Sequence, residues 1–218
     1  MSNLLRTANK FLKLSGGDLL VKNNNEALKE ISNMFKFDSR IELANENWDE
    51  LGEGSSRIIF KMSDSLILKL AKNDAGIDQN KSEMSMRAPC LNNVLAGDLE
   101  GKWIISRFTE TMSEDAFKDA VGISFKTFMA ALYFHWNNEK HEGKPNDYDD
   151  IKEHPLFKCL SGLVDSKDLQ IGDCSKTSSW GMLDGKPLLR DFGLTKDVFI
   201  DHYDDPENKT KTISISKT

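Results

Sequence analysis

With 218 residues, of which 39% are apolar and 29% charged, the chain suits one domain, or a two-lobed domain with a short extension. Its formal net charge of -6, without basic runs interleaved with aromatic residues, argues against a nucleic-acid partner. No apolar run is long enough to cross a membrane, so we expect no membrane partner either.

The cysteines and the N-terminus both favour a cytoplasmic protein. Cys90, Cys159 and Cys174 are odd in number and far apart, without the spacing of a zinc site or a disulfide framework. The first residues contain isolated apolar pairs but no continuous apolar region or cleavage site of a signal peptide. A reducing compartment fits these features best.

The first half of the chain predicts a helical extension followed by a small lobe of strands. Residues 1–48 look helical, and Asn25 can cap a helix over residues 26–36. From Trp48 on, β-prone runs alternate with short turns, and one helix around residues 77–87 ends before Pro89. The clearest runs are residues 57–62, 66–70, 93–99 and 102–108. We expect a five-stranded antiparallel lobe over residues 49–109.

The second half predicts a reduced, mainly helical lobe over residues 110–204. Ser113 can cap a helix, and an apolar stripe continues into a longer one. The stripe comprises Phe125, Phe128, Met129, Leu132 and Trp136. A polar loop over 137–153, a short helix near 154–164 and three strand-like pieces follow. These pieces are residues 169–171, 180–183 and 187–190, with Asp184-Gly185 as a hairpin turn between the last two. Residues 205–218 form a polar tail, and the fold class is α+β.

A glycine loop, Leu51-Gly52-Glu53-Gly54-Ser55-Ser56-Arg57, lies between two predicted strands. Glycines allow the backbone to approach a phosphate closely and to offer it N–H donors. The alternative is a plain hairpin turn, and Arg57 stands where the usual motif has a third glycine.

Two further charged residues follow this loop on suitable elements. Lys69 is the single charge in the apolar strand Leu66–Leu70, where a lysine can bridge phosphates. Glu83 lies on the next helix, where a carboxylate can pair with such a lysine. The alternative is two solvated surface charges.

Two aspartates in the second half complete the pattern. Asp191 begins Asp191-Phe192-Gly193 at the end of a predicted strand, where its carboxylate suits Mg²⁺ bound to phosphates. Asp173 follows a short predicted strand and could accept a hydroxyl proton. Its alternative role is that of a surface acid in a polar loop.

Taken in order, these elements resemble the protein kinase superfamily and its smaller aminoglycoside-kinase-like relatives over roughly residues 48–200. The blocks L-G-E-G-S-S-R, G-I-D-Q-N-K-S-E and S-S-W-G...L-L-R-D-F-G-L-T are similar to uncharacterised kinase-like proteins of tailed bacteriophages and their prophages. The resemblance implies a truncated two-lobed kinase-like fold with ATP and Mg²⁺ as cofactors. A phage-encoded chain would act in the cytoplasm of the bacterial host.

The resemblance also implies roles for individual residues. Gly52, Gly54 and Ser55 would lie over the phosphates, and Lys69, held by Glu83, would contact the α- and β-phosphates as a catalytic residue. Asp173 would be the catalytic base, Asp191 the Mg²⁺ ligand, and Ser178 falls where the family has a metal-binding asparagine.

The pattern departs from the family in the region of Asp173. Ile171 and Gly172 replace the usual histidine and arginine, and the Ser178 hydroxyl is a weaker Mg²⁺ ligand than an amide carbonyl. Only residues 194–218 follow Gly193, and they contain no Ala-Pro-Glu motif.

Three interpretations therefore stay open. In the first, the chain is a phosphotransferase that acts on an unknown small-molecule or protein hydroxyl. Alternatively it is a pseudokinase that serves as a phage-encoded binding or structural module, with a host or phage protein as partner. In the third, the motifs are coincidental in an unrelated α+β domain.

Overall fold

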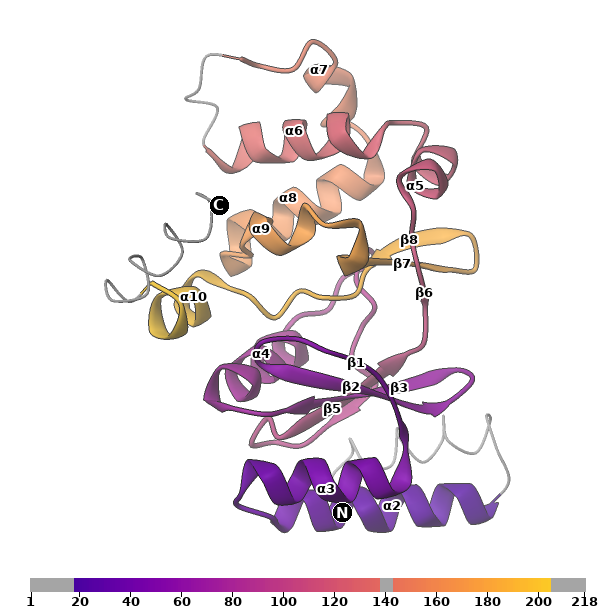
Figure 1. Cartoon of the computed structure of the whole chain (residues 1–218). Coiled ribbons are helices and arrows are strands. Elements are labelled where there is room, and N and C mark those ends of the chain that lie inside the picture. The colour runs from indigo at the N-terminus through magenta and orange to yellow at the C-terminus, as the bar shows by residue number, and fades with distance from the viewer. Residues whose placement is uncertain (1–17, 138–142, 205–218) are drawn as a thin grey trace, which may run out of the picture. The chain divides into compact units, whose positions relative to one another are not determined.

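The computed structural model describes residues 18–137 and 143–204, so the expected tail at 205–218 and the first part of the expected extension lie outside the described residues. The chain divides into two compact units, and Figure 1 shows it coloured by residue number. Of the described residues, unit 1 contains 18–87 and Asn92–Thr109, and unit 2 contains Ala88–Leu91, 110–137 and 143–204. The boundary expected at residue 48 falls inside unit 1.

Unit 1 is built on a five-stranded sheet, and every neighbouring pair of strands is antiparallel, which confirms the predicted sheet. The strands are β1 (Asp49–Glu53), β2 (Arg57–Ser63), β3 (Leu66–Ala71), β4 (Ala96–Gly97) and β5 (Trp103–Arg107), in the order β1-β2-β3-β5-β4. Strand β4 is much shorter than the predicted run at 93–99. Only Ala96 and Gly97 pair with β5, at the edge of the sheet.

The two faces of this sheet carry different side chains because residues alternate along each strand. Helices α2 (Asp18–Asn33) and α3 (Phe37–Asn47) pack on the apolar face. The apolar residues of this core are Ala27, Leu28, Ile31, Ala44, Trp48, Ile58, Phe60, Met62, Leu66, Leu68, Leu70, Ala96, Trp103 and Ile105. Lys69, one residue out of step with its apolar neighbours in β3, belongs to the other face. Figure 1 shows helix α4 (Asp74–Ser85) on that side of the sheet.

The predicted helix start at Asn25 is wrong, because helix α2 begins at Asp18 and contains Asn25. The neighbouring Asn24 is buried, and its Oδ1 accepts a hydrogen bond of 2.8 Å from Trp48 Nε1. The polar side chain in this part of α2 thus binds Trp48, which lies beyond helix α3, instead of capping a helix end. Rules for helix caps consider only neighbouring residues and cannot predict such a distant partner.

Unit 2 combines helices with a three-stranded sheet, β6-β7-β8, formed by Glu110–Thr111, Trp180–Leu183 and Lys186–Leu189. Its described helices are α5 (Glu114–Val121), α6 (Phe125–Trp136), α7 (Tyr148–Ile151), α8 (Pro155–Lys167), α9 (Ile171–Cys174), the 3-10 helix η1 (Thr177–Ser179) and α10 (Lys196–His202). Ser113 caps α5 as predicted, since its Oγ accepts from Ala116 N at 3.1 Å. Gly122, at φ +77°, ends that helix before α6 begins.

Two local predictions in this unit have opposite outcomes. The turn between β7 and β8 is confirmed, with Asp184 and Gly185 both at positive φ, as a two-residue hairpin needs. The strand predicted at 169–171 is wrong. Leu169 makes only an isolated bridge to Thr195, and Ile171 begins helix α9. Ile171 and Cys174, three residues apart, are both buried, a spacing that suits a helical turn.

A disulfide joins Cys90 to Cys159 across a sequence separation of 69 residues, so the expectation that the cysteines form no disulfide is wrong. Both cysteines belong to unit 2, and Cys159 lies on α8. Cys174 is a buried free thiol. Spacing patterns compare cysteines that are close in sequence, so they do not predict this pair, whose sulfurs only the fold brings together.

Removing this disulfide should destabilise unit 2. We expect the double variant Cys90→Ser/Cys159→Ser to lose about 2 to 4 kcal/mol of unfolding free energy, because a closed loop restricts the unfolded chain. Urea unfolding with and without a thiol reductant measures the effect. The reductant should lower the stability of the wild type and leave that of the double variant unchanged. Equal sensitivity of both proteins would contradict the prediction.

Candidate functional site

The predicted glycine loop is shorter in the structure, because residues 51–53 belong to β1 and Arg57 begins β2. Residues 54–56 join the two strands, and their turn is closed by Gly54 N donating to Arg57 O at 2.8 Å. Gly52 and Gly54 do not have positive φ. An added Cβ would meet nothing within 4 Å at Gly52 and only Arg57 O, at 3.7 Å, at Gly54. Gly52 lies where the register of β1 on β2 shifts, as at a β-bulge, and the described residues leave room for a side chain at both glycines.

The loop is fastened to the first turn of helix α4. Asn73 caps this helix with its Oδ1, which accepts from Gly76 N at 3.0 Å, and its Nδ2 donates to Ser55 O at 3.0 Å. Gly76 packs so closely that an added Cβ would lie 2.1 Å from Ser56 O. The end of the glycine loop and the start of α4 thus form one packed piece.

The ion pair predicted between Lys69 and Glu83 is present. Lys69 Nζ lies 2.9 Å from Glu83 Oε1 and 2.8 Å from Oε2, so the ammonium group is held by both carboxylate oxygens. Lys69 is 3% exposed and Glu83 is fully buried, which excludes the alternative of two solvated surface charges. A buried pair of this kind persists only when its hydrogen bonds are satisfied.

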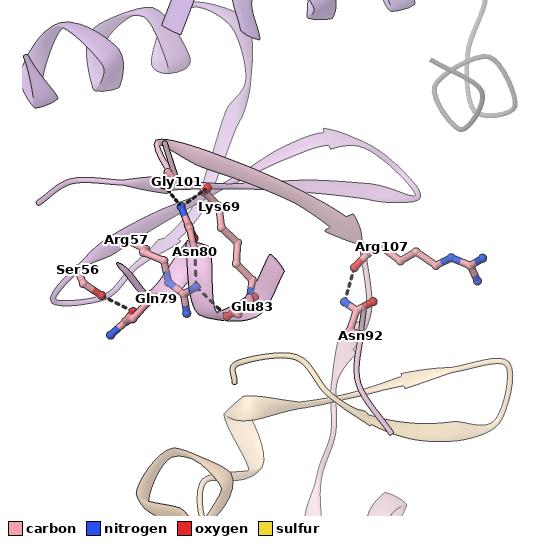
Figure 2. A network of polar contacts seen from close by, with 9 residues as sticks. All are labelled: Ser56, Arg57, Lys69, Gln79, Asn80, Glu83, Asn92, Gly101 and Arg107. Carbon is pink, nitrogen blue, oxygen red and sulfur yellow. Dashed lines mark hydrogen bonds and ion pairs between the residues drawn. The ribbon is translucent and has the colours of Figure 1, made fainter. Parts of the chain in front are cut away.

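Arg57 also binds Glu83, a role that the sequence did not predict. Its Nη1 lies 2.7 Å from Glu83 Oε1 and 3.3 Å from Asn80 Oδ1, and Asn80 Nδ2 donates to Gly101 O at 2.9 Å. Figure 2 shows these side chains converging below the sheet, together with the 2.7 Å hydrogen bond from Ser56 Oγ to Gln79 Oε1.

The sequence positions of Arg57 and Lys69 predict that the two residues share one face of the sheet, but only once the register of β2 on β3 is known. Ile59 is paired with Lys69, and Arg57 precedes Ile59 by two residues, so Arg57 and Lys69 belong to the same face of the sheet. Asn80 and Glu83, three residues apart, share one face of α4.

In unit 2, Asp191 and Asp173 both act on the buried thiol of Cys174. Burial is the main cause that raises the pKa of Cys174 to about 12, and the negative charges of Asp173 and Asp191 add to it. Burial also lowers the pKa of the neighbouring Arg190, and the negative charge of Asp191 partly offsets this by raising it. The two predicted aspartates therefore lie close enough to influence one group.

The surroundings of Asp173 differ from the loop that was predicted. The residue lies in helix α9, and its Oδ1 accepts from Lys176 Nζ at 3.1 Å. Its side chain is 28% exposed. Ser178 is exposed in η1, and its backbone oxygen accepts from Arg190 Nε at 3.0 Å and from Nη2 at 2.8 Å. Asp191 follows β8 and is half-buried, and Phe192 beside it is fully buried.

The described residues show neither a metal-binding cluster nor a membrane-spanning helix, and two comparisons with known proteins found no match. Within residues 18–137 and 143–204, no three His, Cys, Asp or Glu side chains are grouped so that they could hold a metal ion. None of the helices in those ranges has both the length and the apolar character to cross a membrane. No model of a known protein family matches the chain, and neither does any curated protein.

Proposed function

We propose that the chain is an atypical, truncated protein kinase-like protein that binds ATP with Mg²⁺ and transfers the γ-phosphate to a hydroxyl acceptor. The observation that carries the proposal is the buried pair of Lys69 in β3 with Glu83 in the following helix. A lysine held this way offers a fixed positive charge to phosphate oxygens at little cost of reorganisation.

The glycine loop supports the same proposal. The described residues leave room at both Gly52 and Gly54, so a ligand can approach the backbone closely there. In the proposed function the backbone of Gly52, Gly54 and Ser55 covers the phosphates. Lys69 then binds the α- and β-phosphates.

The second unit would supply the acidic groups. Asp191 would be a ligand of Mg²⁺, with Ser178 as a weaker second one, and Asp173 would accept the hydroxyl proton of the acceptor. Bound Mg²⁺ would neutralise charge on the transferred phosphoryl group. Because Mg²⁺ commonly takes one or two carboxylates and completes its shell with water and phosphate oxygens, a set of only a few protein ligands fits it.

The alternative proposal is a pseudokinase that serves as a binding or structural module, with a host or phage protein as its partner. The ion pair of Asp173 with Lys176 favours it, because the carboxylate that would have to receive the hydroxyl proton already binds a neighbouring ammonium group. The exposed Ser178 in place of an asparagine favours it as well.

Phosphate transfer and nucleotide binding test the proposal together. Lys69→Met and Asp191→Ala should each lower the rate of γ-phosphate transfer or ATP hydrolysis by about 100-fold or more, as loss of a group that stabilises transition-state charge does. Lys29→Met and Asp119→Ala, which change exposed residues of α2 and α5, serve as matched controls. They should leave the rate unchanged.

A thermal-unfolding titration separates the two proposals. ATP at about 100 times its Kd should stabilise the wild type by about 2.7 kcal/mol. Stabilisation that needs Mg²⁺, together with transfer or hydrolysis, supports the phosphotransferase. Stabilisation without either reaction supports the pseudokinase. A protein that ATP stabilises neither with nor without Mg²⁺ would overturn the nucleotide-binding proposal.

A further inference from the structure

We infer that Arg57 is a positioning residue that holds Glu83, and with it helix α4, independently of Lys69. Two cations from neighbouring strands bind the Glu83 carboxylate: Arg57 at 2.7 Å and Lys69 at 2.8 Å. All three groups are buried, with Arg57 only 7% exposed. The inference concerns the geometry of unit 1, and only its link to ATP rests on the proposed function.

Arg57 joins α4 to the sheet through two residues of the helix. Its Nη1 donates both to Glu83 and to Asn80 Oδ1, so it bridges two successive polar residues on one face of the helix. Asn80 in turn donates to the backbone of Gly101, in the turn before β5. One guanidinium therefore links the start of β2, the helix and, through Asn80, a third segment (Figure 2).

The position of Arg57 also couples the helix to the glycine loop. Arg57 is the first residue of β2, directly after the loop, and its backbone oxygen closes the loop turn by accepting from Gly54 N. Ser56, one residue earlier, bonds to Gln79, which precedes Asn80 in α4. The loop and the helix are thus fixed to each other through consecutive residues on both sides.

This arrangement has a consequence for Lys69. A buried carboxylate that loses its cation is left with a large desolvation cost. Because Arg57 also binds Glu83, the carboxylate keeps a second cation when Lys69, still held by Glu83, shares its hydrogen bonds with a phosphate. Helix α4 then keeps its place when a ligand binds Lys69.

Hydrogen exchange of the α4 backbone amides tests the inference in the absence of nucleotide. Arg57→Met should raise exchange over residues 74–85 by about tenfold or more, because it removes hydrogen bonds to a charged group. Lys69→Met should raise it by less than about threefold, since Arg57 remains. Lys61→Met, which changes a lysine two positions beyond Ile59 on the same strand, should have no effect and is the matched control.

A conservative variant keeps the test decisive if Arg57→Met does not fold. Arg57→Lys retains the charge for Glu83 but not the planar fork, so α4 should exchange at a rate between those of the wild type and Arg57→Met. If Arg57→Lys does not fold either, Arg57→Gln takes its place, and its α4 exchange is compared with that of the wild type and Lys69→Met. Two results would overturn the inference. One is unchanged exchange of the α4 amides in the folded Arg57 variants, and the other is an increase in Lys69→Met as large as that in Arg57→Met.

An ATP titration of the same proteins separates this inference from the proposed function. Affinity for ATP should fall in Arg57→Met and recover in part in Arg57→Lys, in parallel with the protection of α4. Weakened affinity with α4 fully protected would mean that Arg57 contacts the nucleotide directly, which overturns the positioning role. A wild type that does not bind ATP, with exchange as expected, would overturn the proposed function and support the positioning role.

Discussion

Replacing Glu83 by alanine should lower the free energy of unfolding of unit 1 by about 3 to 5 kcal/mol, because it leaves buried charges without their partner. The carboxylate binds Lys69 Nζ with both oxygens and Arg57 Nη1 with one, and it has no exposed surface. Its loss therefore removes a carboxylate that two buried cations bind. Urea unfolding followed by far-UV circular dichroism measures the change.

Two further proteins show whether the charges are the cause. Glu42→Ala removes an exposed glutamate of α3 and should change stability by no more than about 0.5 kcal/mol. The triple variant Arg57→Met/Lys69→Met/Glu83→Leu removes all three charges together. It should regain most of the lost stability, because apolar residues of similar size commonly replace buried ion pairs without net loss. Equal stability of Glu83→Ala and Glu42→Ala would refute the prediction.

Replacing Trp180 by alanine should destabilise unit 2 by about 3 to 5 kcal/mol through the cavity it leaves. Trp180 is fully buried in β7, and its ring packs edge-on against Phe117, Phe125 and Phe128 at centroid distances of 5.4, 6.3 and 6.5 Å. Its Nε1 also donates to Cys174 O at 2.7 Å. One side chain thus supports α5, α6 and the end of α9, the helix that carries Asp173.

Circular dichroism rather than fluorescence should follow this unfolding, because the substitution removes a tryptophan. Trp136→Ala, which truncates a partly exposed tryptophan at the end of α6, is the matched control and should cost less than about 1 kcal/mol. Trp180→Phe keeps an aromatic ring but loses the hydrogen bond, so its effect should lie between the two. A cost for Trp180→Ala as small as that for Trp136→Ala would contradict the central role of this residue.

Part of the candidate site could be predicted because it depends on strand and helix patterns. Lys69 interrupts an apolar strand, and Glu83 lies on the next helix, so a buried pair was a reasonable expectation that the structure confirms. In the sequence alone, Arg57 stands out only as a departure from a glycine motif. Its contact with Glu83 spans 26 residues and needs the register of β2 on β3, which no local pattern provides.

The acidic half of the site was harder to predict. Asp173 was expected after a strand, yet it lies in a four-residue helix whose formation follows from burial of Ile171 and Cys174. The polar segment 137–153 was expected to be a loop, yet Tyr148–Ile151 form helix α7, with Tyr148 and Ile151 buried. In both places a weak local preference gave way to packing that involves other elements.

The sequence by itself determined the features that depend on a few adjacent residues. These include the alternation in β2 and β3, the Ser113 cap and the Asp184-Gly185 turn, because backbone geometry and neighbouring side chains suffice to favour them. Only the tertiary structure decided the Asn24–Trp48 contact, the Cys90–Cys159 disulfide and the shared hold of Arg57 and Lys69 on Glu83. Each of these needs distant chain segments to meet in one register, and that depends on how the whole core packs.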